Sequence, residues 1–366
     1  MSVNRIKLSL AILFLLLAMA CTKKELSPLD DFSAFDGQVL KGKEFRLAND
    51  SILYMPYNFS IRDSIGIFND ISGSTAVTLV NMNDGSIIKK FVFSGDQESD
   101  FDINAISVNS AINSKSDFTV LQLNPPCKVV RYNWGKLLTS SYKPNPIYYT
   151  KKFGYNSSFL LNDSTIFGQL AYSKFDNKMF AIANISSNTL TTGLDLPRFE
   201  NKAFDHYYQD STFYSVFKSV LNLKLQVRPG SNFEFVYFSG KGALMQIFDI
   251  DRDNRFNVKY EKVYYLPLFN VVSTPQQTRA KMLPGSKNGF NDVAVTEKKI
   301  YTLFNGSDKG EVFCDDILVY DWQGNPVEKL KLDRKCRRIS IDENNPKVMF
   351  AMYGATNVRL VKYILP

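Results

Sequence analysis

The sequence is poor in the residues that most often carry metal or proton chemistry. Among 366 residues there are one histidine, two tryptophans and four cysteines. A lone histidine, His206, excludes sites built from several imidazoles, and no Gly-x-Ser-x-Gly elbow is present. Alternate aspartates in 249–254 resemble a calcium loop, but Asn254 stands where that loop needs glycine, so a turn is favoured. We therefore name no catalytic residue, metal site or cofactor.

The chain also lacks an apolar run long enough to span a membrane near its N-terminus. The run Leu8 to Ala20 is shorter than the roughly 20 residues that a spanning helix needs. Arg5 and Lys7 precede it, and Cys21 follows it. This order predicts a signal peptide over residues 1–20.

Residues 17–21 resemble the lipobox of bacterial lipoproteins, although Met19 departs from the usual small residue. The resemblance implies lipidation of Cys21 and attachment to a membrane in the cell envelope, with an incidental cysteine as the alternative. Because Thr22 is not aspartate, the outer membrane is favoured, and the leaflet is open. Residues 21–37 are polar without periodicity, which predicts a lipid-anchored flexible tether.

The rest of the chain reads as short strands separated by turns. Its 29 Phe and 19 Tyr suit half-buried pleated surfaces. Residues 290–332 contain four apolar or alternating runs bounded by turn residues, and 338–364 contain three more. Six third strands can be counted, so we predict an all-β six-bladed propeller over residues 38–366. A β-sandwich pair is the alternative.

A last unit of three strands needs a fourth from elsewhere in the chain. The predicted donor is Val39 to Leu47, an N-terminal strand that joins the last blade and closes the ring. The chain resembles the TolB-like six-bladed β-propeller lipoproteins of Bacteroidota, with Gly289 to Val295 as the closest match to their inner-strand pattern. The resemblance implies a fold and an envelope location, and little chemistry.

Candidate binding residues follow from the faces of such a ring. Long insertions at 142–153, 197–211 and 267–288 are predicted to share one face, where ligands usually dock. The possible ligand-face residues are His206, Tyr207, Arg334, Lys335, Arg337 and Arg338. The basic ones could attract an anionic glycan or phosphate, or form a solvated strand face. The possible channel-lining residues are Asp102, Asn104, Asn291 and Asp292, which could equally hold water.

Three cysteines remain beyond Cys21. A two-residue turn at 324–325 would place Cys314 opposite residue 335, beside Cys336, so a Cys314–Cys336 disulfide is possible. Two buried thiols are the alternative. Cys127 would remain unpaired and buried.

Together these features predict a non-catalytic module of the cell envelope that binds a protein or an anionic glycan, or serves as a scaffold. One alternative is a propeller hydrolase or lyase that uses a channel-bound cation. Another is a sensor or receptor component. The formal charge of +8 includes two positive charges of the predicted signal peptide, so the mature domain is moderately basic and a nucleic-acid partner is not expected.

Overall fold

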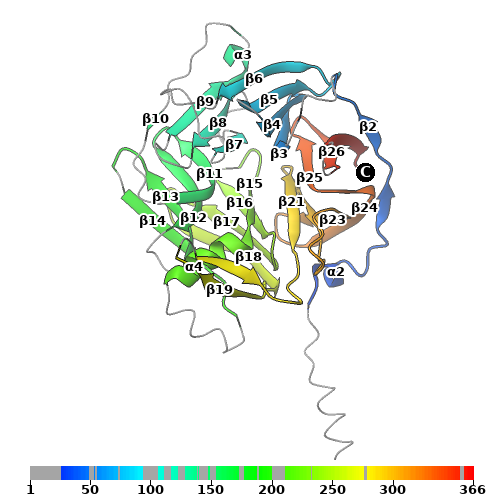
Figure 1. Ribbon diagram of the computed structural model, residues 1–366. Coiled ribbons are helices and arrows are strands. Elements are labelled where there is room, and N and C mark those ends of the chain that lie inside the picture. Colours follow the sequence, from blue (N-terminus) through cyan, green and yellow to red (C-terminus); the bar gives the residue numbers. More distant parts are fainter. Residues whose placement is uncertain are drawn as a thin grey trace, which may run out of the picture.

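The computed structural model is a mostly β ring (Figure 1). It describes residues 26–48, 53, 56–72, 75–93, 106–110, 117–122, 128–137, 139, 147–148, 154–172, 177–187, 189–199, 211–231, 233–275, 278–354 and 358–366. Within these residues, six sheets of four or five strands form the blades of a β-propeller. No helix in the described part is long and apolar enough to cross a membrane.

The first three blades follow the chain in order. Blade 1 contains β3 (Pro56–Arg62), β4 (Ile65–Ser72), β5 (Thr75–Asn81) and β6 (Ile87–Phe93). Blade 2 contains β7 (Ile106–Ser110), β8 (Asp117–Gln122), β9 (Lys128–Asn133) and β10 (Ile147–Tyr148), with α3 (Trp134–Leu137) after β9. Blade 3 contains β11 (Gly154–Asn162), β12 (Thr165–Tyr172), β13 (Lys178–Asn184) and β14 (Thr189–Asp195).

The last three blades contain the best-described strands. Blade 4 has β15 (Leu223–Val227), β16 (Glu234–Ser239), β17 (Ala243–Ile250) and β18 (Phe256–Tyr265). Blade 5 has β21 (Phe290–Val295), β22 (Lys299–Phe304), β23 (Cys314–Asp321) and β24 (Pro326–Cys336). Blade 6 has β25 (Arg338–Asp342), β26 (Asn345–Tyr353) and β27 (Arg359–Ile364). From β7 through β11, β15, β21 and β25 to β3, each first strand contacts the first strand of the next blade, so these strands form the inner wall of the ring.

The N-terminal segment closes the ring, as predicted. Strand β2 (Lys43–Phe45) pairs antiparallel with β27, with Lys43 opposite Lys362. Figure 1 shows blue β2 along the outer edge of the orange and red last blade. The predicted single strand over 39–47 is, however, divided at Gly42. Upstream of Gly42, β1 (Gln38–Leu40) pairs in parallel with β24 of blade 5 instead.

Gly42 marks the crossing from blade 5 to blade 6. A Cβ atom there would lie only 2.2 Å from Cγ1 of the Val361 side chain. The chain therefore passes too close to blade 6 for a side chain at this position. The N-terminal segment straps two blades together rather than completing only one.

The predicted flexible tether over 21–37 is wrong for its second half. Ser27 caps the short helix α2 (Pro28–Asp31), and Phe32 after it is fully buried. The ring of Phe32 meets that of Tyr320 edge-on at a centroid distance of 5.0 Å. Asp31 accepts hydrogen bonds from Lys262 Nζ and Tyr264 Oη, both at 2.6 Å. One buried aromatic ring and one paired carboxylate thus fix a segment whose composition is mostly polar.

The motif at 289–295 begins with a glycine, Gly289, because the chain there lies directly against the backbone of blade 4. The Gly289 amide donates to the Gly240 carbonyl of blade 4 at 3.0 Å. A Cβ atom on Gly289 would lie 1.7 Å from the Gly242 carbonyl oxygen. The backbones of blades 4 and 5 therefore approach too closely here for any other residue.

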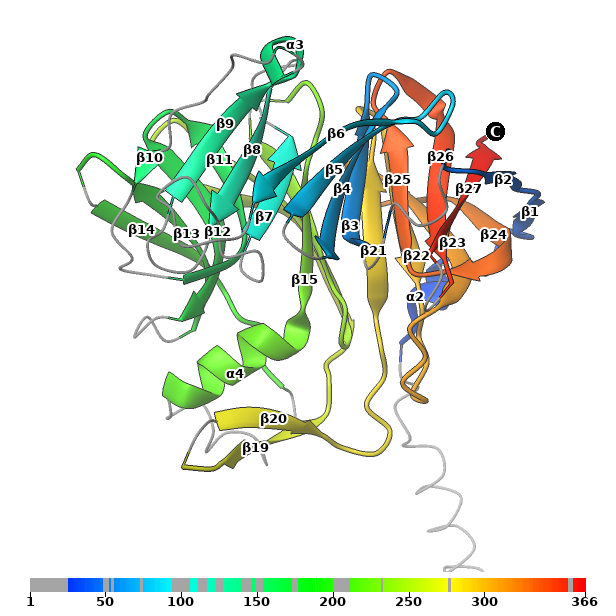
Figure 2. The ribbon, with the colours of Figure 1, turned by 45° about the horizontal axis from the view of Figure 1, so that its top comes forward.

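Residues 200–210 of the predicted insertion 197–211 lie outside the described residues, but the helix that follows it and the hairpin within the predicted insertion 267–288 share one face of the ring. Helix α4 (Ser211–Leu221) directly precedes blade 4, and the hairpin of β19 (Phe269–Ser273) and β20 (Thr278–Met282) precedes blade 5. They contact each other, with the Phe213 and Phe269 rings stacked at 5.7 Å, and Figure 2 shows them side by side. We call this the insertion face. Within the third insertion, 142–153, residues 147–148 instead form the outer strand β10.

We call the docked N-terminal segment, residues 26–45, the strap. The buried ring of Phe32 provides a test of its docking. Replacing Phe32 with alanine is expected to lower the free energy of unfolding by about 3–5 kcal/mol, because the cavity would lie between blades 4 and 5. Urea unfolding measures the change. Leu26→Ala, at a side chain that is 53% exposed, is the control and should cost less than about 0.5 kcal/mol. Equal effects of the two substitutions would contradict the docked segment.

Candidate functional site

The inner strands β15, β21 and β25 begin at the insertion face, because the connections from the preceding blades arrive there (Figure 2). Four charged residues lie at or just before these strand starts: Lys224, Asp292, Arg337 and Arg338. Their electrostatic interactions link blades 4, 5 and 6. We call these four residues the mouth cluster.

Asp292 joins two blades. The Ile339 amide of blade 6 donates to Asp292 Oδ2 at 2.9 Å, and Asp292 is only 6% exposed. The next blade junction repeats the arrangement, since the Ile61 amide of blade 1 donates to Ser340 Oγ at 3.1 Å. Asp292 and Ser340 are each the third residue of their inner strand. A side-chain acceptor at this position therefore satisfies a buried amide of the following blade.

The two arginines reach to opposite sides of blade 6. Arg338 Nη1 donates to the Asn291 carbonyl at 3.2 Å and to the Arg337 carbonyl at 3.1 Å. Arg337 Nη2 donates to the Pro56 carbonyl of blade 1 at 2.9 Å. The buried Arg337 Nε has no hydrogen-bond partner. The structure thus brings the predicted ligand-face residue Arg338 together with the predicted channel residues 291 and 292, whereas Arg337 reaches towards blade 1.

The sequence-based reasoning missed Lys224. Burial, and then repulsion from Arg338, lowers its pKa from 10.5 to about 8, against the attraction of Asp292. Burial raises the pKa of Asp292, although Arg338 and Lys224 act in the opposite direction. Burial and Arg338 together lower the pKa of Arg337. Two cations, Arg338 and Lys224, thus act on one carboxylate. One feature of the sequence could have identified Lys224. It is a charged residue within a strand, 223–227, whose other residues alternate between apolar and polar.

The other predicted basic residues are neutralised outside this cluster. Lys335 pairs with Glu311 at 3.0 Å. Arg334 pairs with Asp333 at 3.4 Å and lies over the Tyr353 ring. They are therefore not part of the mouth cluster. His206, Tyr207, Asp102, Asn104, Cys21 and Cys127 lie outside the described residues.

Cys314 and Cys336 are direct cross-strand partners and are present as buried free thiols. The predicted register, 314 opposite 335, is off by one because two irregularities interrupt the β23–β24 pairing. Asn291 Nδ2 donates to Cys314 Sγ at 3.2 Å. Burial raises both thiol pKa values, that of Cys336 to about 12. The disulfide itself stays a prediction.

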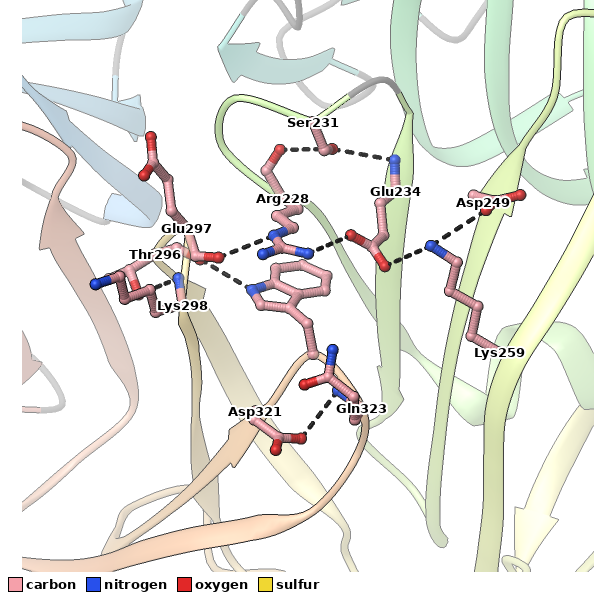
Figure 3. Close-up of polar contacts among 11 residues, drawn as sticks. Arg228, Ser231, Glu234, Asp249, Lys259, Thr296, Glu297, Lys298, Asp321 and Gln323 are labelled. Carbon is pink, nitrogen blue, oxygen red and sulfur yellow. Dashed lines mark hydrogen bonds and ion pairs between the residues drawn. The ribbon is translucent and has the colours of Figure 1, made fainter.

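A second polar network lies at the other ends of blades 4 and 5 (Figure 3). Glu234 accepts from Arg228 at 2.7 Å and from Lys259 at 2.8 Å, and Lys259 also pairs with Asp249 at 3.2 Å. The Arg228 guanidinium lies 5.4 Å from the Trp322 ring centroid. Two cations meet two carboxylates here, so the charges balance and the network joins the blades.

The described residues contain no group of three or more histidine, cysteine or acidic side chains placed to hold a metal ion. The chemistry that the mouth cluster can offer is a concentration of positive charge and N–H donors. Such a set suits anionic oxygen atoms.

The low pKa of Lys224 makes a stability prediction. Below pH 8 the ammonium is charged in both the folded and the unfolded chain, and its burial beside Arg338 costs stability. Between pH 8 and about 10.4 the folded protein loses this proton first, so that cost disappears. Lys224→Met should therefore raise the free energy of unfolding at pH 7 by about 1 kcal/mol, and by less at pH 10.

Urea unfolding at the two pH values measures this difference. Lys335→Met, which removes an exposed cation, is the matched control and should show a change below about 0.5 kcal/mol. A less stable Lys224→Met variant at pH 7 would show that the charge is fully compensated in the fold.

Comparison with known proteins agrees with this architecture. Residues 168–344, from β12 into blade 6, match the family model described as TolB-like 6-blade propeller-like. No curated protein matches the chain.

Similar solved structures include the β-propeller domain of Cps50 (Swd1) from Myceliophteria thermophila. It has 9% sequence identity and a TM-score of 0.45, over 88% of this chain and 99% of that one. Another is the gluconolactonase XC5397 from Xanthomonas campestris, at 10% identity and a TM-score of 0.47, over 86% and 87% of the two chains.

Proposed function

We propose that this protein is a lipid-anchored binding module of the cell envelope, with the insertion face as its ligand-binding face. Its partner is an envelope protein or an anionic glycan. The observation that carries the proposal is the group of basic side chains at the starts of the inner strands, where Arg338 repels both Lys224 and Arg337 and the buried Arg337 Nε has no hydrogen-bond partner. Strongly perturbed ionisable groups gathered in one place are typical of functional sites.

The anchor follows from the lipobox resemblance at Cys21. Residues 22–26 separate Cys21 from Ser27, where contact with the propeller begins. Even fully extended, this linker spans no more than about 20 Å. The strap therefore holds the propeller close to the lipid surface, much closer than a tether reaching residue 37 would.

The charges of the mouth cluster favour a binding module over the alternative function, a hydrolase or lyase that uses a channel-bound cation. That alternative needs a carboxylate free to hold a divalent cation, yet Asp292 accepts the Ile339 amide. Lys224 and Arg338 also act on Asp292 electrostatically, and they would repel a cation placed beside it. The same two side chains attract an anion.

Photo-crosslinking in intact cells tests this proposal. A benzophenone amino acid at Val312, 61% exposed on the insertion face, should capture a discrete partner. The same probe at Gln323, exposed on the opposite face, is the matched control. Lys224→Met should reduce the Val312 product at least several-fold. Cys21→Ser should release the protein from the membrane fraction.

Equal labelling from positions 312 and 323, or no labelling from 312, would overturn the binding face. Retention of the Cys21→Ser variant in the membrane fraction, at the wild-type level, would overturn the anchor.

A further inference from the structure

We propose that Cys314 and Cys336 are joined by a disulfide in the mature protein, and that this bond secures the segment that closes the ring. In the structure the two residues are thiols and lie directly opposite each other on β23 and β24. The inference goes beyond ligand binding. It rests on the proposed location in the cell envelope, because disulfides form and persist in oxidising compartments.

The geometry of the pair suits a disulfide. Residues directly opposite each other on antiparallel strands have Cα atoms about 4.5–5.5 Å apart, and a disulfide needs about 4.4–6.8 Å between the same atoms. Cys314 and Cys336 occupy such opposite positions. Cys336 also acts electrostatically on the Cys314 thiol, so the two side chains lie near each other. The bond can therefore form without a large movement of the backbone.

The pair lies beyond an interruption in the β23–β24 pairing. The nearest regular partners are Asp316 and Lys331. Between them and the cysteines, residues 332–335 of β24 lie opposite residue 315 of β23. We call residues 332–335 the β24 excursion. Because such an interruption breaks the ladder of hydrogen bonds, a covalent bond between the cysteines would fix the far end of the excursion.

The β24 excursion carries a contact that closes the ring. Asp333 accepts hydrogen bonds from the Gly42 amide of the strap at 3.2 Å and from the Tyr363 hydroxyl of blade 6 at 2.8 Å. Gly42 is the point at which the strap crosses from blade 5 to blade 6. A disulfide beside the excursion therefore restrains the residue that joins the strap to both blades.

Burial protects the bond once it has formed. Cys314 and Cys336 are both buried, in the same apolar cluster as Leu40 of the strap. Burial raises the pKa of the Cys336 thiol to about 12, so the folded chain holds little of the reactive thiolate at neutral pH. The bond therefore forms during folding, before the strap covers the pair, and resists reduction afterwards.

The reaction is a thiol–disulfide exchange with a protein disulfide oxidant of the envelope. The thiolate of one cysteine attacks the S–S bond of the oxidant, which gives a mixed disulfide and releases one oxidant thiol. The second cysteine then attacks the sulfur of the first, which forms the 314–336 bond and releases the other oxidant thiol. The pair loses two electrons and two protons, and the oxidant gains them as a dithiol.

Peptide mapping of the protein from the envelope fraction tests the bond itself. Free thiols are alkylated under denaturing conditions before digestion. We expect a peptide pair joined through Cys314 and Cys336, with Cys127 alkylated. Alkylation of both Cys314 and Cys336, or a bridge from Cys127 to either of them, would overturn the inference.

Urea unfolding of the purified full chain, with and without dithiothreitol, tests the contribution of the bond. A disulfide that closes a loop of roughly 20 residues raises the folding equilibrium constant by about 30- to 1,000-fold. Reduction should therefore lower that constant at least about tenfold. In the matched control, Cys314→Ala/Cys336→Ala, dithiothreitol should leave it within twofold. An equal response of the two proteins would place the reducible bond elsewhere and overturn the inference.

Hydrogen exchange distinguishes a bond that secures ring closure from a general gain in stability. Exchange over residues 38–45 of the strap should be at least threefold faster in the reduced wild type than in the oxidised wild type. Exchange over β17 should stay within twofold. Equal acceleration in both segments would overturn the link to ring closure. Because only the wild type is used, this test remains decisive if the alanine variant does not fold.

Refolding of the reduced chain in a glutathione redox buffer separates this inference from the proposed function. A 314–336 bond formed in the buffer, with both thiols alkylated in the protein from cells, would overturn the bond in the mature protein together with its envelope location. Absence of the bond in the buffer as well would overturn the pairing alone. The crosslink from position 312 would then still decide the binding module.

Discussion

The pairing of β2 with β27 is the interaction on which the rest of the ring depends. It joins the first described strands to the last blade, and so holds β25 beside β3 of blade 1. The Arg337 contact with Pro56 and the Ser340 contact with Ile61 both cross this junction. Without closure, the orientation of Arg337 would be lost, and with it one side of the mouth cluster. The fold and the candidate site therefore share one constraint.

The strap upstream of β2 distributes this constraint over three blades. Phe32 and Asp31 dock on blades 4 and 5, and β1 lies on β24 before the chain crosses at Gly42. A ring held closed in this way can remain folded even where repulsion between buried charges lowers its stability. Lys224 beside Arg338 is such a cost, and the buried, unpaired Nε of Arg337 is another. Both features lie at one end of the inner wall, where a bound ligand could offset their loss of stability.

Much of the fold could be predicted from the sequence because each blade is a local pattern. The apolar run Ile317 to Tyr320 and the turn residues after it specify the β23–β24 hairpin without knowledge of distant residues. Helix α4 was missed, although Phe213, Val216, Phe217 and Val220 follow helical spacing. The site was harder, because Lys224 lies more than 100 residues from Arg338 in sequence. Only the order of blades around the ring brings them together, and no local pattern encodes that order.

Disulfide trapping tests ring closure most directly. Lys43 and Lys362 are cross-strand partners, so the Lys43→Cys/Lys362→Cys variant should form a 43–362 disulfide under mild oxidation, identified by peptide mapping. Lys43→Cys/Ile364→Cys, displaced by two residues along β27, should crosslink much more slowly. Equal rates for the two pairs, or no 43–362 bridge at all, would contradict the closed ring and the mouth cluster that depends on it.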